Sequence, residues 1–390
     1  MLDSTKIKNE LAELKRAGLT RELREYPHAG GRISIDGKDY LNFSSNDYLD
    51  LANSERLKEF AKNSINLYGT GSGASRLVSG TLPCHAELEQ HLATFKKYPA
   101  ALVFGSGYMA NVGVISGLYG RNSHVVCDRL VHASIIDGAI LSRATLHRFA
   151  HNDTEHLERI LKKLPSNAER VVVTESVFSM DGDLAPLQRI AELCSEYNVG
   201  LMVDEAHACG VFGDKGAGLV NSLGLTDQVD IVIGTLSKAL GSFGGFIACS
   251  ESIRNLLVSR ARSLIFSTAP PPSVMGAALG ALEYLDENPD AGKELLERAS
   301  YLRGRLAGHG IETGNSDSQI VPVIIGGNDR VLAVADYLRS RNIVVAAIRA
   351  PTVPVGTERI RLSVTLAHEK PDLDYVAQTI ADAVKRVIPV

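Results

Sequence analysis

Short runs of β-branched and other apolar residues recur along the middle of the chain, with amphipathic helical patterns between them. From about residue 46 to residue 282 the runs read ALVF, HVVCD, RVVVTES, GLMVDEA, DIVIGT and GGFIAC. Apolar runs of this length that alternate with helices are typical of strands buried on both faces of a parallel sheet. The pattern therefore predicts an α/β fold, with a mainly parallel central sheet and helices on both of its faces.

The two ends of the chain follow other patterns. The first 18 residues predict an amphipathic helix, and the segment GRISIDGKDYLNF alternates around an Asp36-Gly37 turn signal, which predicts a hairpin. After the sheet region, the prolines of STAPPPSV interrupt the helix, a long helical stretch follows to about Gly308, and further short runs predict a smaller α+β domain. We therefore expect an N-terminal arm, a large domain and a small C-terminal domain, over 1–45, 46–285 and 286–390.

Composition narrows the classes of function. The chain has 390 residues, of which 45% are hydrophobic and 22% charged, as in an ordinary globular protein. Its 41 Lys and Arg against 45 Asp and Glu offer no bulk attraction to nucleic acid or to an anionic membrane. The N-terminus lacks an apolar signal core, and the five cysteines contain no C-x-x-C pair. We therefore expect a cytoplasmic protein without nucleic-acid or membrane partners.

Polar residues close the apolar runs. Because ligands in parallel α/β folds bind beyond the carboxyl ends of the strands, these residues are candidates for a site. They are Ser106, Asp128, Glu175, Asp204 and Thr235, and Ser179 lies just beyond Glu175. Asp181 and Asp183 in the same segment are more typical of a turn than of a metal site, and no residues have a metal-ligand spacing.

Lys238 is the most informative of the polar residues. It stands in DIVIGTLSKALGSFGG, directly after a predicted strand and before a glycine-rich turn. A lysine amine at such a strand end, partly removed from water, is suited to form a Schiff base. Thr235 and Ser237 supply hydroxyl donors for a phosphate, and the glycines permit close approach of the backbone. The alternative interpretation is a solvated lysine in a surface loop.

Asp204 and His207 close another strand in GLMVDEAHACG. A carboxylate that faces a pyridine nitrogen keeps the nitrogen protonated and makes the ring an electron sink, and the imidazole is suited to donate to a phenolic oxygen of that ring. The alternative is a polar strand terminus with a capping Asp and an incidental His. The letters DEAH also occur in certain helicases, but the phosphate loop G-x-x-x-x-G-K-[ST] that those proteins need is absent from this sequence.

Two further segments are suited to an anionic, planar ligand. In ALVFGSGYMANVGVISGL a strand passes through a glycine-rich turn into a helix that begins near Tyr108, and free N–H groups at a helix start bind phosphate. His132 follows the HVVCD run, where it could stack on a planar cofactor or simply form a structural hydrogen bond. The glycine cluster GTGSGA partly matches a dinucleotide fingerprint, but it follows a helical pattern, which disfavours NAD.

Nearly the whole chain resembles the α-oxoamine synthases, which are pyridoxal-phosphate-dependent enzymes of fold type I, the aspartate aminotransferase fold. The segments that carry the resemblance are LNFSSNDYLDL, GTGSGASRLVSGT, DRLVHASIIDGA, RFAHNDTEHL, TESVFSMDGD, MVDEAHACGVFG, TLSKALGS and IRAPTVPVGTERIRLSVTLAHE. The resemblance implies that Lys238 carries the cofactor, that Asp204 pairs with its ring nitrogen, and that His132 stacks on the ring while His207 meets the phenolic oxygen. It also implies a homodimer with shared active sites. The implied phosphate contacts are Gly107, Tyr108, Thr235 and Ser237, together with Thr268 toward the phosphate of the neighbouring subunit.

The resemblance also implies the substrates. RFAHND and IRAPTVP are more similar to the branch that joins L-alanine to a pimeloyl thioester in biotin biosynthesis than to the glycine-using ligases. Asn46 and Arg361 match positions that hold the amino-acid carboxylate, for which a guanidinium fork is suited; a surface ion pair is the alternative for Arg361. Ser75 stands where the glycine-using aminolevulinate synthases have threonine, which leaves room for the methyl group of alanine. Arg21 and Arg24 lie near the position of an arginine that meets the acyl chain in relatives.

The expected reaction is a decarboxylative condensation. The amine of Lys238 removes the Cα proton, the carbanion attacks the thioester of pimeloyl-CoA or of a pimeloyl-acyl carrier protein, and carbon dioxide is lost to give 8-amino-7-oxononanoate. A near alternative is a 2-amino-3-ketobutyrate CoA ligase that uses glycine and acetyl-CoA. A more distant alternative is a catalytically silent relative that binds a partner, against which the intact set of candidate catalytic residues argues.

Overall fold

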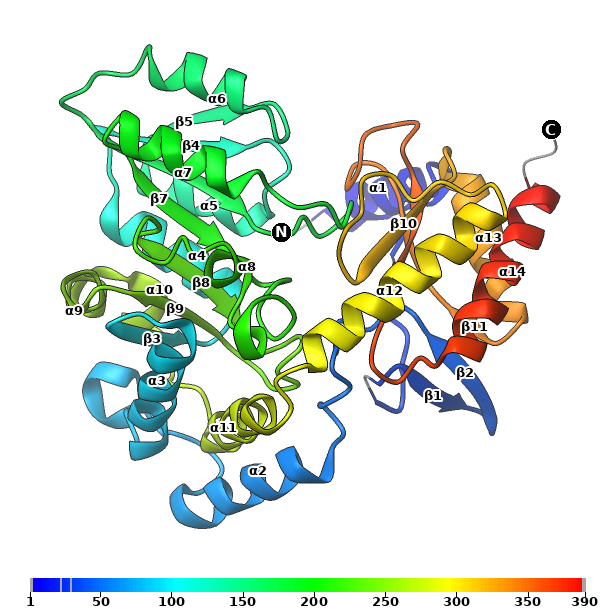
Figure 1. Cartoon of the computed structure of the whole chain (residues 1–390), viewed down its shortest axis with the longest axis horizontal. Coiled ribbons are helices and arrows are strands. Elements are labelled where there is room, and N and C mark those ends of the chain that lie inside the picture. The colour runs from blue at the N-terminus through cyan, green and yellow to red at the C-terminus, as the bar shows by residue number, and fades with distance from the viewer. Residues whose placement is uncertain (1–2, 22, 29, 388–390) are drawn as a thin grey trace. The chain divides into compact units, whose positions relative to one another are not determined.

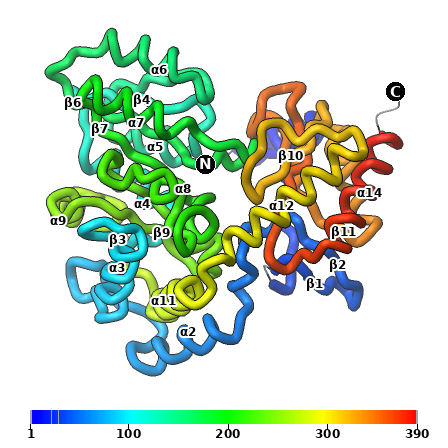
Figure 2. Tube along the Cα trace, viewed as in Figure 1, coloured from blue at the N-terminus to red at the C-terminus, as the bar shows by residue number. Residues whose placement is uncertain are grey.

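The computed structural model describes residues 3–21, 23–28 and 30–387. Their contacts divide the chain into two compact units. The large unit is Asn46–Glu297, and the small unit combines the residues before Asn46 with those from Arg298 onward. Figures 1 and 2 show the large unit from the blue of α2 through cyan and green to yellow, and the small unit in darker blue and in yellow to red. The division into domains over 1–45, 46–285 and 286–390 stays a prediction.

A seven-stranded sheet forms the centre of the large unit (Figure 1). In spatial order its strands are β3 (Ala100–Phe104), β9 (Gly245–Cys249), β8 (Ile231–Thr235), β7 (Gly200–Asp204), β6 (Glu169–Glu175), β4 (Ser123–Asp128) and β5 (Thr145–Phe149). In this spatial order, the adjacent strands from β8 through β7, β6 and β4 to β5 pair in parallel, whereas β9 pairs antiparallel with both β3 and β8. The predicted mainly parallel sheet is therefore confirmed.

Both faces of this sheet are buried. Successive residues such as Val172 and Val173 on β6, whose side chains point to opposite faces, have at most 1% of their surface exposed. On one face, α4 (Gly107–Leu118) packs against β3, β8 and β9, and also against α5 (Ala133–Ser142), α9 (Glu251–Arg260) and α10 (Arg262–Ile265) (Figure 2). The other helices of the unit are α2 (Glu55–Tyr68), α3 (Pro83–Lys96), α6 (Thr154–Leu161), α7 (Leu187–Glu196), α8 (Leu219–Ser222) and α11 (Pro272–Glu287).

Two elements differ from the sequence expectation. The long helix expected after the prolines is two helices, α11 and α12 (Ala291–Gly308), because Pro289 disfavours a helical backbone at Asn288, which ends α11. The strand β5 was also not predicted, because TLHRF is a half-exposed edge strand and has no continuous apolar run.

The small unit contains two three-stranded sheets. β1 (Arg32–Ile35) and β2 (Lys38–Asn42) form the predicted hairpin, and positive φ values of 51° at Asp36 and 74° at Gly37 suit its two-residue turn. β11 (Ile343–Val344) pairs in parallel with β2. β10 (Ile320–Ile324), β13 (Arg359–Ser363) and β12 (Ala346–Ile348) form an antiparallel sheet. The helices α1 (Ser4–Arg16), α13 (Asn328–Ser340) and α14 (Lys370–Val387), with the part of α12 from Arg298 onward, complete the unit. None of the helices in the described ranges is long and apolar enough to span a membrane.

Candidate active site

Lys238 lies in a tight turn that follows β8. The hydroxyls of Thr235 and Ser237 both donate to the carbonyl oxygen of Gly244, at 2.9 and 3.1 Å, and the Gly244 amide donates to Ser237 Oγ at 3.1 Å. Gly241 has a φ of +57°, and a Cβ there would lie 2.6 Å from the amide nitrogen of Ala52. The turn that presents Lys238 therefore requires both the hydroxyls and the glycine found in the sequence motif.

A chain of polar contacts connects Lys238 to a buried tyrosine. Lys238 Nζ lies 2.7 Å from His207 Nε2, and His207 Nδ1 lies 2.7 Å from the hydroxyl of Tyr48, which in turn donates to Asn46 Oδ1 at 3.2 Å. One assignment of protons satisfies all three contacts: the ammonium donates to Nε2, Nδ1–H donates to the phenol oxygen, and the phenol donates to the amide oxygen. Tyr48 therefore holds His207 in one tautomer.

Asp204, at the end of β7, is held by a residue that the sequence analysis did not select. Asn111 on α4 donates through Nδ2 to Asp204 Oδ2 at 2.7 Å and to Ser134 Oγ at 3.0 Å. The amide of Ala206 donates to Asp204 Oδ1 at 2.9 Å. Asn111 is a lone amide on a buried apolar helix face, and since buried amides need partners, this signal could have identified it.

His132 is oriented at the start of α5. Its Nδ1 lies 2.7 Å from Ser134 Oγ and also accepts the amide of Ser134 at 3.3 Å, so Nδ1 is an acceptor. Since Ser134 Oγ accepts from Asn111, one set of hydrogen bonds connects His132 to Asp204. Burial lowers the pKa of His132, which favours the neutral imidazole.

Glu175 stands beside Asp204 in the parallel β6–β7 ladder. Its Oε1 accepts the backbone amide of His132 at 2.5 Å. Burial, together with the charge of Asp204, raises the pKa of Glu175 to about 8.

The start of α4 is suited to bind an anion. Ser106 Oγ accepts the amide of Met109 at 3.1 Å, while the amides of Gly107 and Tyr108 in the first turn have no acceptor within the helix. A Cβ on Gly107 would lie 3.7 Å from Thr235 Cβ, and one on Gly245 would lie 2.4 Å from the Gly107 nitrogen. The glycines therefore let the helix start lie directly against the end of β8, next to the turn of Lys238.

The remaining predicted residues belong to other elements of the two units. Ser75 pairs with Thr268 in an isolated antiparallel bridge of the large unit. Ser179 lies in the turn that follows β6. A hydrogen bond of 3.0 Å from the Phe178 amide to the carbonyl of Asp183 closes this turn. In the small unit, Arg361 lies on β13, where it is buried and donates to Ser363 Oγ at 2.8 Å. Arg21 lines a groove of about 830 Å³ together with residues of α1 and residues 347–352. Arg24 is exposed.

These groups fit a planar pyridine ring that carries an aldehyde and a phosphate. An amine that can form a Schiff base, a buried carboxylate for a ring nitrogen, and a helix start for a phosphate all lie at the carboxyl edge of one sheet. The large unit thus brings together ten of the predicted residues: Asn46, Gly107, Tyr108, His132, Glu175, Asp204, His207, Thr235, Ser237 and Lys238.

Comparisons with known proteins agree with this interpretation. The model of the aminotransferase class I and II family matches residues 38–380. An 8-amino-7-oxononanoate synthase from Citrifermentans bemidjiense is 45% identical over 97% of this chain and 98% of its own length, and a putative one from Geobacillus kaustophilus is 44% identical over 98% of each. Among solved structures, a serine palmitoyltransferase variant from S. paucimobilis with a bound PLP–myriocin aldimine superposes with a TM-score of 0.93 at 31% identity, covering 99% of both chains. The 8-amino-7-oxononanoate synthase from Francisella tularensis gives a TM-score of 0.78 at 29% identity, covering 89% of this chain and 98% of its own.

Proposed function

We propose roles for the site residues from the premise that the chain belongs to the aminotransferase class I and II family and, within it, to the 8-amino-7-oxononanoate synthases. The resemblance found in the sequence motifs is thereby confirmed, and so is the pyridoxal phosphate cofactor. The activity is the condensation of L-alanine with a pimeloyl thioester, with loss of carbon dioxide, to 8-amino-7-oxononanoate in biotin biosynthesis. Bound pyridoxal phosphate supplies an aldehyde for the amino group and a ring that stores the electron pair left at Cα.

The contact between Lys238 and His207 beside Asp204 carries the assignment of roles. Lys238 binds the cofactor and, once its amine is released, removes the proton from the substrate Cα. Asp204, which Asn111 holds in place, pairs with the ring nitrogen and keeps that nitrogen protonated. His207, oriented through Nδ1 by Tyr48, meets the phenolic oxygen of the ring with Nε2, which would carry a proton when it donates to that oxygen.

The other residues bind and orient. His132, a neutral imidazole fixed through Nδ1, stacks on the ring, and Glu175 and Ser179 complete the cofactor site. The amides of Gly107 and Tyr108 bind the phosphate together with the hydroxyls of Thr235 and Ser237, which exchange their present acceptor, the Gly244 carbonyl, for phosphate oxygens. For the substrate, we assign Asn46 and Arg361 to the carboxylate of L-alanine and Ser75 to the space around its methyl group.

We further propose a homodimer with shared sites. Near the Ser75–Thr268 bridge, the large unit exposes apolar side chains that a lone subunit would leave in water: Leu77 is 51%, Val78 79% and Phe266 69% exposed. Such a surface is typical of an interface between subunits. In this arrangement Thr268 reaches the phosphate bound by the neighbouring subunit. Sedimentation equilibrium tests the assembly, and a monomer at assay concentrations would contradict it.

Two measurements test the function. Borohydride reduction of the holoenzyme followed by peptide mass mapping should place the pyridoxyl group on Lys238, and a label on another lysine would refute the central assignment. Steady-state assays should then pair L-alanine or glycine with pimeloyl-CoA, pimeloyl-acyl carrier protein or acetyl-CoA. We expect turnover with L-alanine and a pimeloyl donor; preference for glycine with acetyl-CoA would instead indicate a 2-amino-3-ketobutyrate CoA ligase.

A further inference from the structure

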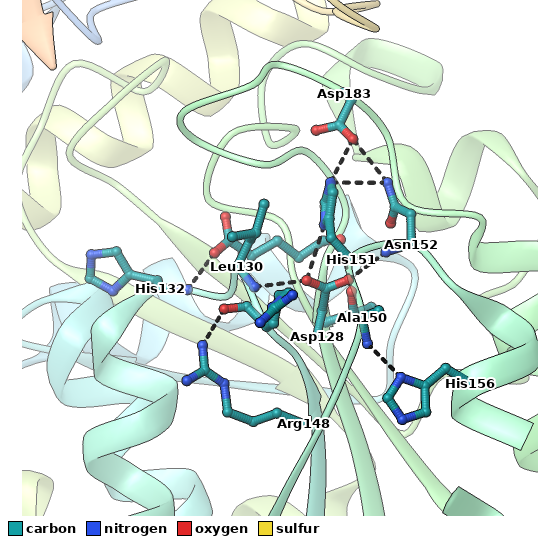
Figure 3. A network of polar contacts seen from close by, with 12 residues as sticks. Asp128, Leu130, His132, Arg148, Ala150, His151, Asn152, His156 and Asp183 are labelled. Atoms are coloured by element: carbon teal, nitrogen blue, oxygen red, sulfur yellow. Dashed lines mark hydrogen bonds and ion pairs between the residues drawn. The ribbon is translucent and has the colours of Figure 1, made fainter. Parts of the chain in front are cut away.

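His151 lies between two aspartates at the carboxyl edge of the sheet, outside the residues assigned above (Figure 3). Its Nδ1 is 3.0 Å from Asp128 Oδ1 and its Nε2 is 2.8 Å from Asp183 Oδ2. Since both ring nitrogens face carboxylate oxygens, both donate protons and the ring is an imidazolium. Burial lowers the pKa of His151, but the hydrogen bonds and charges of the two aspartates outweigh burial and raise the pKa to about 10.

The two aspartates connect His151 to the loops after three neighbouring strands. Asp128 is the wholly buried last residue of β4; its Oδ1 also accepts the amide of Leu130 and its Oδ2 the amide of Asn152, both at 2.8 Å. Asp183 lies in the loop after β6 and also accepts Asn152 Nδ2 at 2.9 Å. His151 itself follows β5. One charged ring therefore joins the ends of β4, β5 and β6, as Figure 3 shows.

The loop that Asp128 holds is the one that carries His132. The amide of Leu130 donates to Asp128 (Figure 3). Two residues later, the amide of His132 donates to Glu175 Oε1. Without the imidazolium, two buried carboxylates would face each other across Asn152 with no cation between them, and a buried charge without its partner forces its surroundings to rearrange. The rearrangement would act first on the Asp128 side chain and on the loop that it anchors.

We propose that His151 is a positioning residue, whose imidazolium between Asp128 and Asp183 fixes the 128–132 loop and thereby sets where the ring of His132 lies in the cofactor site. This inference rests on the role of His132 in the proposed function. It also accounts for the segment RFAHND, which the assigned roles leave unused. His151 supplies the charge, and Asn152 adopts the positive φ of 54° with which its amide reaches Asp128.

The variant His151→Gln tests the proposal, because glutamine keeps a polar side chain but cannot donate to both aspartates or carry the charge. We expect kcat to fall about ten- to hundredfold, because small errors of position at a reacting centre slow the reaction by such factors. The KM for pimeloyl-CoA should change by less than about twofold. We also expect an altered visible circular dichroism band of the bound cofactor, at full cofactor occupancy. That band reports how the ring sits in the site, which a general loss of stability would not change.

His156→Gln is the matched control, since the same substitution then falls in the same segment but away from the two aspartates. His156 Nδ1 accepts the amide of Ala150 at 3.1 Å, so its loss should lower the melting temperature. The cofactor band and kcat of this variant should stay as in the parent. Equal losses of kcat and of the band in both variants would overturn the proposal.

A double-mutant cycle with His132→Ala identifies the route of the effect. If His151 acts through His132, the double variant should have the same kcat as His132→Ala alone. Two outcomes would overturn the inference about His151 and leave the proposed function standing. One is that the kcat losses of the two single variants add in the double variant; the other is that His132→Ala alters the cofactor band while His151→Gln does not. A native kcat and band in His132→Ala would overturn the proposed role of His132 as well. Should His151→Gln fail to fold, Asp128→Asn, which keeps the shape, is measured in its place, and native values there would overturn the proposal.

Discussion

The contact between Tyr48 and His207 offers a test of how the site is oriented. Tyr48→Phe removes one oxygen atom from a side chain that is fully buried, so the ring still fills its space and the change falls on hydrogen bonds alone. The buried Nδ1 of His207 loses an acceptor at 2.7 Å. Loss of a buried hydrogen-bond partner costs about 1 to 3 kcal/mol. If this cost falls on the transition state, kcat/KM should drop by roughly 5- to 150-fold, at about 1.4 kcal/mol for each factor of ten.

The assay is steady-state turnover of L-alanine with pimeloyl-CoA, together with urea unfolding of the same preparation. Tyr98→Phe is the control, because the Tyr98 hydroxyl donates to the carbonyl of Val229 at 3.0 Å in the same unit but not in the site. We expect Tyr98→Phe to lower the free energy of unfolding by about 1 kcal/mol and to leave kcat/KM unchanged. If Tyr48→Phe keeps kcat/KM within about twofold of the parent value, which is about the precision of such comparisons, then Tyr48 does not orient His207 and the reasoning is wrong.

Three further predictions follow from other groups. Asp204→Asn keeps the shape but removes the charge that holds the ring nitrogen protonated, so kcat should fall by about two orders of magnitude or more at full cofactor occupancy measured by absorbance; near-normal turnover would exclude the electron-sink role. Arg361→Lys replaces a fork by a point charge, so the KM for L-alanine should rise far more than that for pimeloyl-CoA in paired titrations, and the reverse would assign Arg361 to the acyl chain. Burial lowers the pKa of His368 from 6.5 to about 3, so as the pH falls the unfolded chain takes up this proton before the folded chain does. The free energy of unfolding should therefore decrease as the pH falls from about 6.5 toward 3. Urea unfolding at pH 7 and pH 5 should show this loss, and His368→Gln should reduce it; an equal loss in the variant would contradict the role of His368.

The sequence predicted most of what lies at the sheet edge. Strands buried on both faces need continuous apolar runs, so each run, and the polar residue that ends it, could be recognised without the structure. Parallel strands end at one edge, which is why Glu175, Asp204 and Thr235 were expected together and do lie on adjacent or nearby strands. The direction of β9 was not predictable, because an antiparallel strand buried on both faces has the same apolar run as a parallel one.

The helix start and the Lys238 turn were likewise predictable, since both depend on local backbone chemistry. Ser106 caps α4, and the glycines after Lys238 permit a turn with positive φ, and these requirements act within a few residues of the chain. By contrast, β5 was not predicted because an edge strand needs no apolar run. The break before α12 was not predicted because the pattern is helical on both sides of Pro289.

Apolar periodicity and local turn chemistry act over short stretches of chain, so the sequence alone predicts which chemical groups the protein has and at which edge of the sheet they lie. Which group holds which depends on the packing of the folded chain. Asn111 reaches Asp204, Tyr48 reaches His207, and His151 reaches Asp183 across separations of 93, 159 and 32 residues. A hydrogen bond needs its two atoms within about 3 Å, and only the packing of distant helices and loops on one sheet brings atoms so far apart in the chain to that distance.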